Sequence, residues 1–297
     1  MEGGKYYLID VFTNQAFSGN PLAVFPNAEG IDTSTMQAIA NELNLSETVF
    51  VGRASYPERY PIRIFTPTME LPFAGHPVIG TAHLLAELGM AKRDRLLTLD
   101  AEVGPLMVGY EKDLARFTAA APVAIQSSTL NPLTAAELLG LKAGEVVGEP
   151  VLASCGLPYH LIELDSLEAL ARAQPSPRVW SEWVSPSGYE QIYPYVIDKT
   201  AGQERALRSR MFSTEGGVRE DPATGSAAAA LAGYLATAMP CPGLWRWEIH
   251  QGIEMGRPSQ IFAEAERTGD SETLILIAGQ AVVIGSGTLH PGSANLQ

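Results

Sequence analysis

The pattern of apolar positions along this chain of 297 residues predicts helices of two kinds. Residues 32–44 form an amphipathic helix, because apolar side chains recur at helical spacing on one face, namely Met36, Ile39, Ala40 and Leu43. Residues 78–88 and 226–238 are apolar on nearly every side. A helix of that character is buried, so the sequence predicts one central buried helix in each half of the chain.

Short strands are predicted around both helices, from runs of β-branched and aromatic residues bounded by turn residues. In the first half they cover residues 6–12, 21–25, 48–51, 60–66, 96–103 and 105–110. In the second half they cover a turn and strand at 154–163, then 245–250, 260–265, 273–277 and 281–284. The weakly patterned stretch 119–133 is the expected linker, residues 134–140 a helix and residues 184–188 a loop.

One strand–turn–helix unit occurs twice. The first copy is Arg63-Ile-Phe-Thr followed by Glu70-Leu-Pro-Phe-Ala-Gly75-His76, and the second is Arg210-Met-Phe-Ser followed by Glu220-Asp221-Pro-Ala-Thr-Gly225-Ser226. From Phe to Gly the spacing is 10 residues in the first copy and 13 in the second. This repeat predicts two similar domains that face each other across a cleft.

Composition agrees with two ordinary globular domains. A chain of this length fits about two domains, and 46% hydrophobic with 18% charged residues is typical of a protein with a generous core. The only cysteines, Cys155 and Cys241, are too few for a disulfide framework, and we expect both to be reduced in the cytoplasm.

The charge pattern excludes several classes of partner. A net charge of −13 argues against nucleic acid, which needs a Lys/Arg footprint, and disfavours anionic membrane surfaces.

The start of the chain lacks the basic segment of a signal peptide. Residues 222–245 carry no charge, but they contain few large apolar side chains and are broken by Pro240 and Pro242. We therefore expect a buried helix there rather than a membrane span.

The two helix starts are the first candidate site. Gly75-His76 and Gly225-Ser226 stand where the buried helices begin. A helix start presents unpaired N–H groups and a partial positive charge, and it therefore holds carboxylates well. The alternatives are that Ser226 is only a helix N-cap and that His76 is only a turn residue. Because the arrangement occurs twice, the sequence favours a ligand site.

Two acidic residues are candidates for proton transfer. Glu47 precedes the apolar strand 48–51 and has no basic neighbour within five residues. A carboxylate at the mouth of a buried strand tends toward a raised pKa, which suits acid–base work near neutral pH. The alternative for Glu47 is a solvated loop residue. Asp221 stands before Pro222 in the second repeat, and is either a second acid or a turn-forming residue.

Other chemistries do not fit the motifs. The segment around Ser226 lacks the Gly-x-Ser-x-Gly pattern of a hydrolase nucleophile. The five histidines show no metal-ligand spacing. Residues 252–256 do not form a dinucleotide fingerprint. Neither cysteine follows a glycine at a helix start, which argues against a racemase with paired thiols.

Seven motifs, in order from residue 10 to 259, resemble the phenazine-biosynthesis isomerase (PhzF-like) family. They are Asp10-Val-Phe-Thr, Phe17-Ser-Gly-Asn-Pro21, Asn44-Leu-Ser-Glu47-Thr, Arg63-Ile-Phe-Thr-Pro67, Glu70-Leu-Pro-Phe-Ala-Gly-His76-Pro, Glu220-Asp-Pro-Ala-Thr-Gly-Ser226 and Gln251-Gly-x-x-x-Gly-Arg-Pro-Ser259.

The resemblance implies an α/β (α+β) fold similar to diaminopimelate epimerase. Each of two pseudo-symmetric domains is then a curled, mostly antiparallel sheet around a central helix, with the active site between the domains. The first domain covers residues 1–120, to which the fold adds 281–297, and the second covers 121–280. Homodimers are also implied.

The resemblance also assigns roles to individual residues. Glu47 matches the catalytic acid/base, and His76 and Asp221 match its catalytic partners. The substrate-binding positions are Ser46, Gly75, Gly225 and Ser226. In the related epimerases two cysteines occupy the facing catalytic positions, which are His76 and Ser226 here.

The expected function is a cofactor-independent isomerase that shifts a proton on a small anionic metabolite. One carboxylate can remove a proton and return it elsewhere on the same face, whereas inversion of a stereocentre needs a base on each face. The alternatives are a non-catalytic carboxylate-binding protein on the same fold, or an amino-acid epimerase or racemase.

Overall fold

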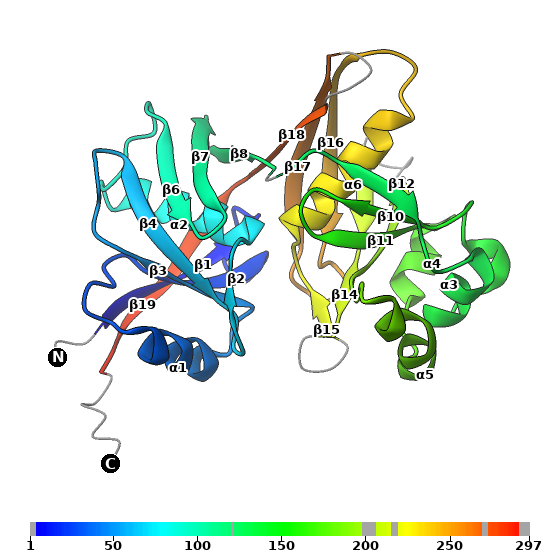
Figure 1. Cartoon of the computed structure of the whole chain (residues 1–297), viewed down its shortest axis with the longest axis horizontal. Helices are drawn as coiled ribbons and strands as arrows, with labels where there is room; N and C mark the ends of the chain where they lie inside the picture. Colours follow the sequence, from blue (N-terminus) through cyan, green and yellow to red (C-terminus); the bar gives the residue numbers. More distant parts are fainter. Residues whose placement is uncertain (1–3, 120, 198–205, 215–218, 269–272, 291–297) are drawn as a thin grey trace. The chain divides into compact units, whose positions relative to one another are not determined.

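The computed structural model describes residues 4–119, 121–197, 206–214, 219–268 and 273–290. The chain divides into two compact units, residues 1–117 with 278–297 and residues 118–277, and Figure 1 shows the path of the chain through each of them. The boundaries expected from the sequence were residues 120 and 280. Of the residues in the two expected domains, 1–3, 120, 198–205, 215–218, 269–272 and 291–297 lie outside the described ones.

Unit 1 is built on one sheet with the strand order β19-β1-β2-β3-β4-β6-β7-β8. The last described strand, which was expected in the first domain, pairs with β1. The strands are β1 (Gly4–Val11), β2 (Asn20–Phe25), β3 (Glu47–Val51), β4 (Arg59–Phe65), β5 (Glu70–Leu71), β6 (Leu97–Ala101), β7 (Gly104–Glu111), β8 (Leu114–Thr118) and β19 (Ala281–Leu289).

Unit 2 has the strand order β9-β10-β11-β12-β13-β16-β17, and a short β14–β15 pair lies beside β12. The strands of the second half are β9 (Ala124–Ser127), β10 (Val151–Ser154), β11 (Pro158–Glu163), β12 (Ile192–Ile197), β13 (Ala206–Ser209), β14 (Met211–Ser213), β15 (Arg219–Asp221), β16 (Gly243–Gln251), β17 (Ser259–Arg267) and β18 (Thr273–Gly279).

The repeat seen in the sequence extends to the sheet topology. Most pairs are antiparallel, and each unit has two parallel pairs in matching places: β2–β3 and β4–β6 in unit 1, and β11–β12 and β13–β16 in unit 2. A parallel pair needs a crossover connection. The second crossover in each unit carries the central helix, which places the repeated motif at the same point of both sheets.

The central helices are α2 (Gly75–Glu87) and α6 (Gly225–Thr237), each of 13 residues. Helix α2 packs on β1, β2, β3, β7 and β19, and α6 packs on β10, β11, β16 and β17. Nearly all of their residues are buried, as the all-round apolar pattern predicted. Helix α2 starts three residues before the predicted bound, because Gly75, His76 and Pro77 form its first turn.

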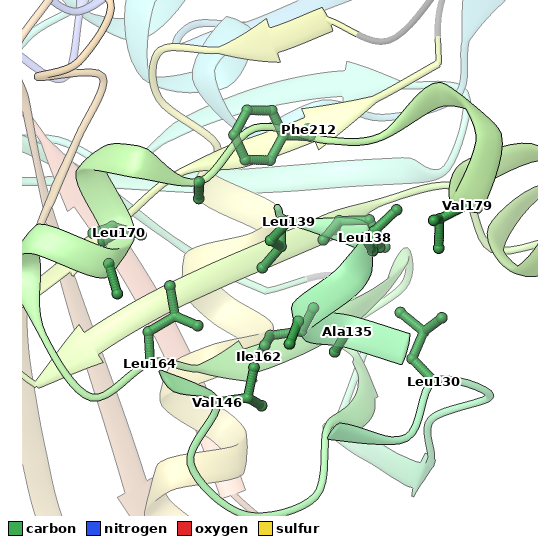
Figure 2. Close-up of a cluster of buried hydrophobic side chains, with 14 of the residues drawn as sticks. Leu130, Ala135, Leu138, Leu139, Val146, Ile162, Leu164, Leu170, Val179 and Phe212 are labelled. Atoms are coloured by element: carbon green, nitrogen blue, oxygen red, sulfur yellow. The ribbon is translucent and has the colours of Figure 1, made fainter. Parts of the chain in front are cut away.

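Shorter helices cover the outside of each sheet. Helix α1 (Thr33–Leu43) crosses between β2 and β3, and Met36 and Ile39 on its apolar face join a cluster with Phe25, Phe50 and Phe65. In unit 2 the corresponding cluster gathers side chains from the outer helices and strands, among them Leu138, Leu139, Ile162, Leu170 and Phe212 (Figure 2). The outer helices there are α3 (Pro132–Leu138), α4 (Leu167–Arg172) and α5 (Pro177–Val179).

Two stretches are more regular than the sequence predicted. The expected linker at 119–133 starts next to the boundary between the units at residues 117 and 118, and it contains β9, an exposed strand that pairs with β10. The expected loop at 184–188 is helical, since a π-helical turn (Trp180–Val184) continues into a 3₁₀ turn (Ser185–Ser187). Both helical turns lie in the crossover between β11 and β12. A parallel pair needs such a crossover connection.

The uncharged stretch 222–245 forms α6 and the start of β16. Among the described residues, none of the helices has the length and apolar character needed to span a bilayer.

Candidate active site

A pair of matched ion pairs supports the repeated motif in the two units. Arg63 donates two hydrogen bonds, of 2.7 and 2.6 Å, to the carboxylate of Glu70. Arg210 donates two, both of 2.7 Å, to Glu220. Arg63 stands on β4 and Arg210 between β13 and β14, and in each unit the glutamate stands on the short strand before the central helix. The fork geometry therefore fixes the turn that leads into each helix start.

The two central helices start without a side-chain cap. Their N-cap residues, Ala74 and Thr224, make no side-chain bond to the first turn. In contrast, α1, α3, α4 and α5 are all capped by a side-chain oxygen. A cap normally satisfies one of the open N–H groups at a helix start. The arrangement leaves both central helices suited to receive an anionic group there.

Glu47 and His76 come together in unit 1. Glu47 is the first residue of β3 and His76 is the second residue of α2. His76 Nε2 lies 3.2 Å from Glu47 Oε2, with the two side chains 6% and 15% exposed. These two atoms are close but do not meet the geometry of a hydrogen bond. Hydrogen bonds between catalytic groups are often poorly aligned without substrate and tighten in the complex.

Burial keeps the His76 ring neutral. It lowers the pKa of His76 from 6.5 to about 3, because the charged imidazolium loses its hydration. On the other side of the ring, the Asn20 amide Nδ2 lies 3.4 Å from His76 Nδ1. Asn20 is fully buried at the start of β2. The histidine therefore stands between a carboxylate and an amide in a dry environment.

In unit 2, Asp221 is held by a network around the turn into α6. The Thr224 hydroxyl donates to Asp221 Oδ2 at 2.5 Å, while Gln251 Nε2 donates to Thr224 Oγ1 at 3.0 Å and to the Asp221 carbonyl at 2.7 Å. Gln251 Oε1 accepts from the Thr224 backbone N–H and from the Tyr193 hydroxyl. All four hydrogen-bonding positions of this buried amide are thus occupied.

The backbone around Gly252 and Ser259 packs closely against the turn that leads into α6. Gly252 has a φ of +73°, and a Cβ there would lie 2.6 Å from the Pro222 carbonyl oxygen. Ser259 donates from its hydroxyl to that carbonyl at 2.9 Å and to the Gln251 carbonyl at 3.0 Å. The motif that runs from Gln251 to Ser259 therefore holds the turn that carries Asp221 in place.

Ser226 is the second residue of α6, as His76 is of α2. The Ser226 hydroxyl lies 2.6 Å from the hydroxyl of Tyr159 on β11. Thr224, not Ser226, is the N-cap, so the idea that Ser226 only caps the helix is wrong. The idea that His76 is only a turn residue is also wrong, because it lies inside the first helical turn.

The remaining predicted positions lie beside these groups. Gly75 and Gly225 are the first residues of their helices and both are buried. Ser46 is half-buried in the bend before β3, next to Glu47. Glu47 is not a solvated loop residue, since its side chain is mostly buried. The structure thus groups Ser46, Glu47, Gly75 and His76 in unit 1, and Asp221, Gly225 and Ser226 in unit 2.

Four further polar residues contact the predicted ones without having been assigned roles from the sequence, namely Asn20, Tyr159, Thr224 and Gln251. Three of them lie inside motifs that carried the family resemblance. Tyr159 follows the turn Gly156-Leu-Pro158, which echoes Gly19-Asn-Pro21. The similarity of these two turns was the feature of the sequence that could have pointed to Asn20 and Tyr159 as site residues.

Two cavities lie away from these residues. One, of about 450 Å³, is lined by β4, β5 and β6 around Arg63 and Glu70. The other, of about 710 Å³, is lined by β9, β10 and Tyr234. Within the part of the chain that the structure describes, there is no cluster of three or more His, Cys, Asp or Glu side chains arranged to hold a metal ion.

Comparison with protein families gives a match over almost the whole chain. The model of the PhzC-PhzF family, described as phenazine biosynthesis-like protein, matches residues 9–287. An uncharacterized isomerase from Mesorhizobium japonicum is 40% identical over 302 residues, which cover 97% of this chain and 99% of the relative. The trans-2,3-dihydro-3-hydroxyanthranilate isomerase of Pseudomonas aeruginosa is 35% identical, over 96% of this chain and 99% of the relative.

A solved structure has the same fold. A phenazine biosynthesis protein of the PhzF family from Bacillus anthracis superimposes with a TM-score of 0.88. The match covers 98% of this chain and 100% of that protein, at 23% sequence identity. The fold expected from the sequence motifs, of the diaminopimelate epimerase type, is therefore confirmed.

Proposed function

The chain belongs to the PhzC-PhzF family of phenazine biosynthesis-like proteins and is an isomerase, and we propose that it moves a proton within a small carboxylic-acid metabolite without a cofactor. In this proposal Glu47 is the acid/base, His76 and Asp221 are its catalytic partners, and Ser46, Gly75, Gly225 and Ser226 bind the substrate.

The observation that carries the proposal is the contact between Glu47 Oε2 and His76 Nε2 at 3.2 Å, in a mostly buried setting. A positive charge beside a carboxylate makes it a weaker base. Because burial keeps His76 neutral, the ring can orient Glu47 without that cost. General acid–base catalysis by one placed group contributes roughly 10²–10⁴-fold, and orientation of the bound substrate supplies more.

Substrate binding in this proposal uses the two uncapped helix starts. The N–H groups of the first turns of α2 and α6 would hold a carboxylate, and Ser226 would add a hydroxyl. We propose that both half-sites contact one ligand. A crystal structure with a bound substrate analogue tests this: a separation of more than about 15 Å between Gly75 and Gly225 is too far for near-contact hydrogen bonds to one small ligand, and contradicts it.

The proposed reaction is a hydrogen shift on one face of a cyclic or allylic acid. One carboxylate takes the proton from one carbon and returns it to another, and the double bond moves with it. The first compound to test is trans-2,3-dihydro-3-hydroxyanthranilate, on which the Pseudomonas aeruginosa relative acts by name. A mixture of metabolic carboxylic acids, followed by NMR in deuterated water, extends the search to other substrates.

The decisive experiment is Glu47→Gln, which keeps the shape of the side chain and removes the base. We expect turnover to fall by at least roughly 10²-fold, while the substrate still binds in a calorimetric titration. Glu42→Gln is the matched control, because Glu42 is exposed on α1 in the same unit. A Glu47→Gln protein with near-wild-type activity would contradict the mechanism.

Two alternatives make different predictions. A non-catalytic binding protein would bind a carboxylate but exchange no proton with deuterated water, with or without Glu47. An epimerase or racemase would convert one stereoisomer into a mixture of both.

A homodimer, which the resemblance implies, stays a prediction that sedimentation equilibrium can test.

A further inference from the structure

In both units, a polar side chain in or directly after a Gly-x-Pro turn contacts the second residue of the central helix. In unit 1 the turn is Gly19-Asn20-Pro21, and the Asn20 amide on β2 lies 3.4 Å from His76 Nδ1 on α2. In unit 2 the turn is Gly156-Leu157-Pro158, and Tyr159 on β11 lies 2.6 Å from Ser226 on α6. Asn20 is the middle residue of its turn, whereas Tyr159 is the first residue after its turn, so the two units reach the second helix residue from different positions.

We propose that Asn20 is a positioning residue that holds His76 as the neutral tautomer with its hydrogen on Nε2, facing Glu47. This inference deepens the proposed function and rests on it for its catalytic meaning, but the tautomer itself is a property of the unliganded protein.

The chemistry of the two groups sets the direction of the hydrogen bond. The Asn20 nitrogen Nδ2 can only donate, so His76 Nδ1 must accept with its lone pair. A neutral imidazole carries one hydrogen, which is therefore on Nε2. That nitrogen lies 3.2 Å from Glu47 Oε2. Asn20 thus decides that His76 offers a donor, rather than an acceptor, to the catalytic carboxylate.

The backbone holds Asn20 firmly enough for this task. Asn20 is fully buried and pairs with Val11 in the β1–β2 ladder. The turn before it is fixed by buried Asp10, whose Oδ2 accepts from the Phe17 backbone N–H at 2.6 Å. Asp10 lies in the first of the seven motifs, and Phe17 lies together with Asn20 in the second. These contacts place the amide against the ring before any ligand binds.

The direct test is the tautomeric state of His76, measured on the full chain with ¹⁵N-labelled histidine by long-range ¹H–¹⁵N correlation. The His76→Gln variant identifies which signals belong to His76. In the wild-type protein at neutral pH we expect an unprotonated Nδ1 and a protonated Nε2. A protonated Nδ1 in the wild-type protein would overturn the inference, whatever the variants show.

Two substitutions test the role of the amide. Asn20→Asp replaces the donor by a carboxylate, so we expect the hydrogen to appear on Nδ1. Asn20→Leu removes the donor at similar size, so we expect a mixture of both tautomers. Asn41→Asp is the matched control, since Asn41 is exposed on α1 and donates to the Pro67 carbonyl at 3.1 Å. An unchanged His76 pattern in a folded Asn20→Asp protein overturns the inference.

Activity supplies a separate readout. With a substrate in hand, Asn20→Asp should lower kcat by roughly 10- to 100-fold, the range expected for losing one hydrogen bond to a charged group, with a smaller change in KM. Asn41→Asp should leave kcat unchanged. If Glu47→Gln keeps its activity while the His76 tautomer is as expected, the proposed function fails and the positioning role of Asn20 stands.

Discussion

The hydroxyl of Thr224 connects a buried amide to the Asp221 carboxylate. It accepts from Gln251 Nε2 and therefore has its own hydrogen left to donate to Asp221 Oδ2, at 2.5 Å. This hydroxyl therefore fixes the direction of the Asp221 carboxylate.

We predict that Thr224→Val, which keeps the shape and removes the hydroxyl, lowers kcat/KM by roughly 10- to 100-fold, since a hydrogen bond to a charged group contributes about 1.5–3 kcal/mol. Thr224→Ser retains the hydroxyl and should recover most of the activity. Steady-state kinetics of both variants, with urea unfolding to check stability, measure this. Equal losses in the two variants would show that the methyl group and packing matter, not the hydroxyl.

Among the elements, the two copies of the strand–turn–helix unit use the same ion pair in different surroundings. The side chains of Arg63 and Glu70 are 36% and 29% exposed, and Arg63 also contacts Thr33 at the start of α1. The side chains of Arg210 and Glu220 are only 10% and 16% exposed. Arg210 also donates to carbonyl oxygens at the end of α4, including that of Ala173 at 2.7 Å. Arg210 therefore connects the turn, the sheet and an outer helix.

We predict that Arg210→Met destabilises the protein by about 3–5 kcal/mol, because it leaves Glu220 and the α4 carbonyl oxygens without their buried partner. Arg63→Met, the matched substitution in the first copy, should cost about 1 kcal/mol or less, because a half-exposed pair is compensated by water. Urea unfolding of both variants gives the two free energies. If Arg63→Met lowers the free energy of unfolding as much as Arg210→Met does, the solvent exposure of the ion pair does not determine its contribution to stability.

Across the whole chain, three buried histidines link stability to pH. Burial lowers the pKa of His76 to about 3 and those of His83 and His160 to about 4. His83 donates from Nε2 to the Gly279 carbonyl at 3.0 Å, and His160 Nδ1 is hydrogen-bonded to the Ser128 hydroxyl at 2.7 Å. All three are therefore neutral in the folded protein near neutral pH.

These shifts predict that the protein is stable above pH 6.5 and loses stability as the pH falls. Below the ordinary pKa of 6.5 the unfolded chain binds protons that the folded chain rejects, down to pH 3–4. Near pH 5 each histidine should lower the free energy of unfolding by about 1.4 kcal/mol per pH unit. Urea unfolding between pH 7.5 and 4.5 measures the slope.

The slope also distinguishes the two units. His76 and His83 lie in unit 1 and His160 in unit 2, so separate unfolding steps should show about twice the pH dependence for unit 1. His160→Gln should remove the dependence of the unit 2 step and leave that of unit 1 unchanged. A stability that stays flat from pH 7.5 to 4.5 would contradict the buried neutral state of all three histidines.

Local sequence determined the elements that carry the site. Residues 78–88 and 226–238 are apolar on every side, and such a helix can only be stable when buried, so both central helices were predictable. Helix α1 was predicted to within one residue at each end, because Asp32 caps it and Asn44 ends it in the left-handed conformation. The repeated Arg and Glu positions also indicated two similar units, before any pairing was known.

Tertiary structure alone decided which side chains meet. Asn20 and His76 are 56 residues apart, and Tyr159 and Ser226 are 67 apart, yet each pair is in contact because parallel strands and their crossovers bring distant segments together. Strand β9 and the helical turns at 180–187 exist for the same reason, since neighbouring elements stabilise them and their own residues show no pattern. A sequence pattern records what each segment buries, but the partner of a buried polar group depends on the fold.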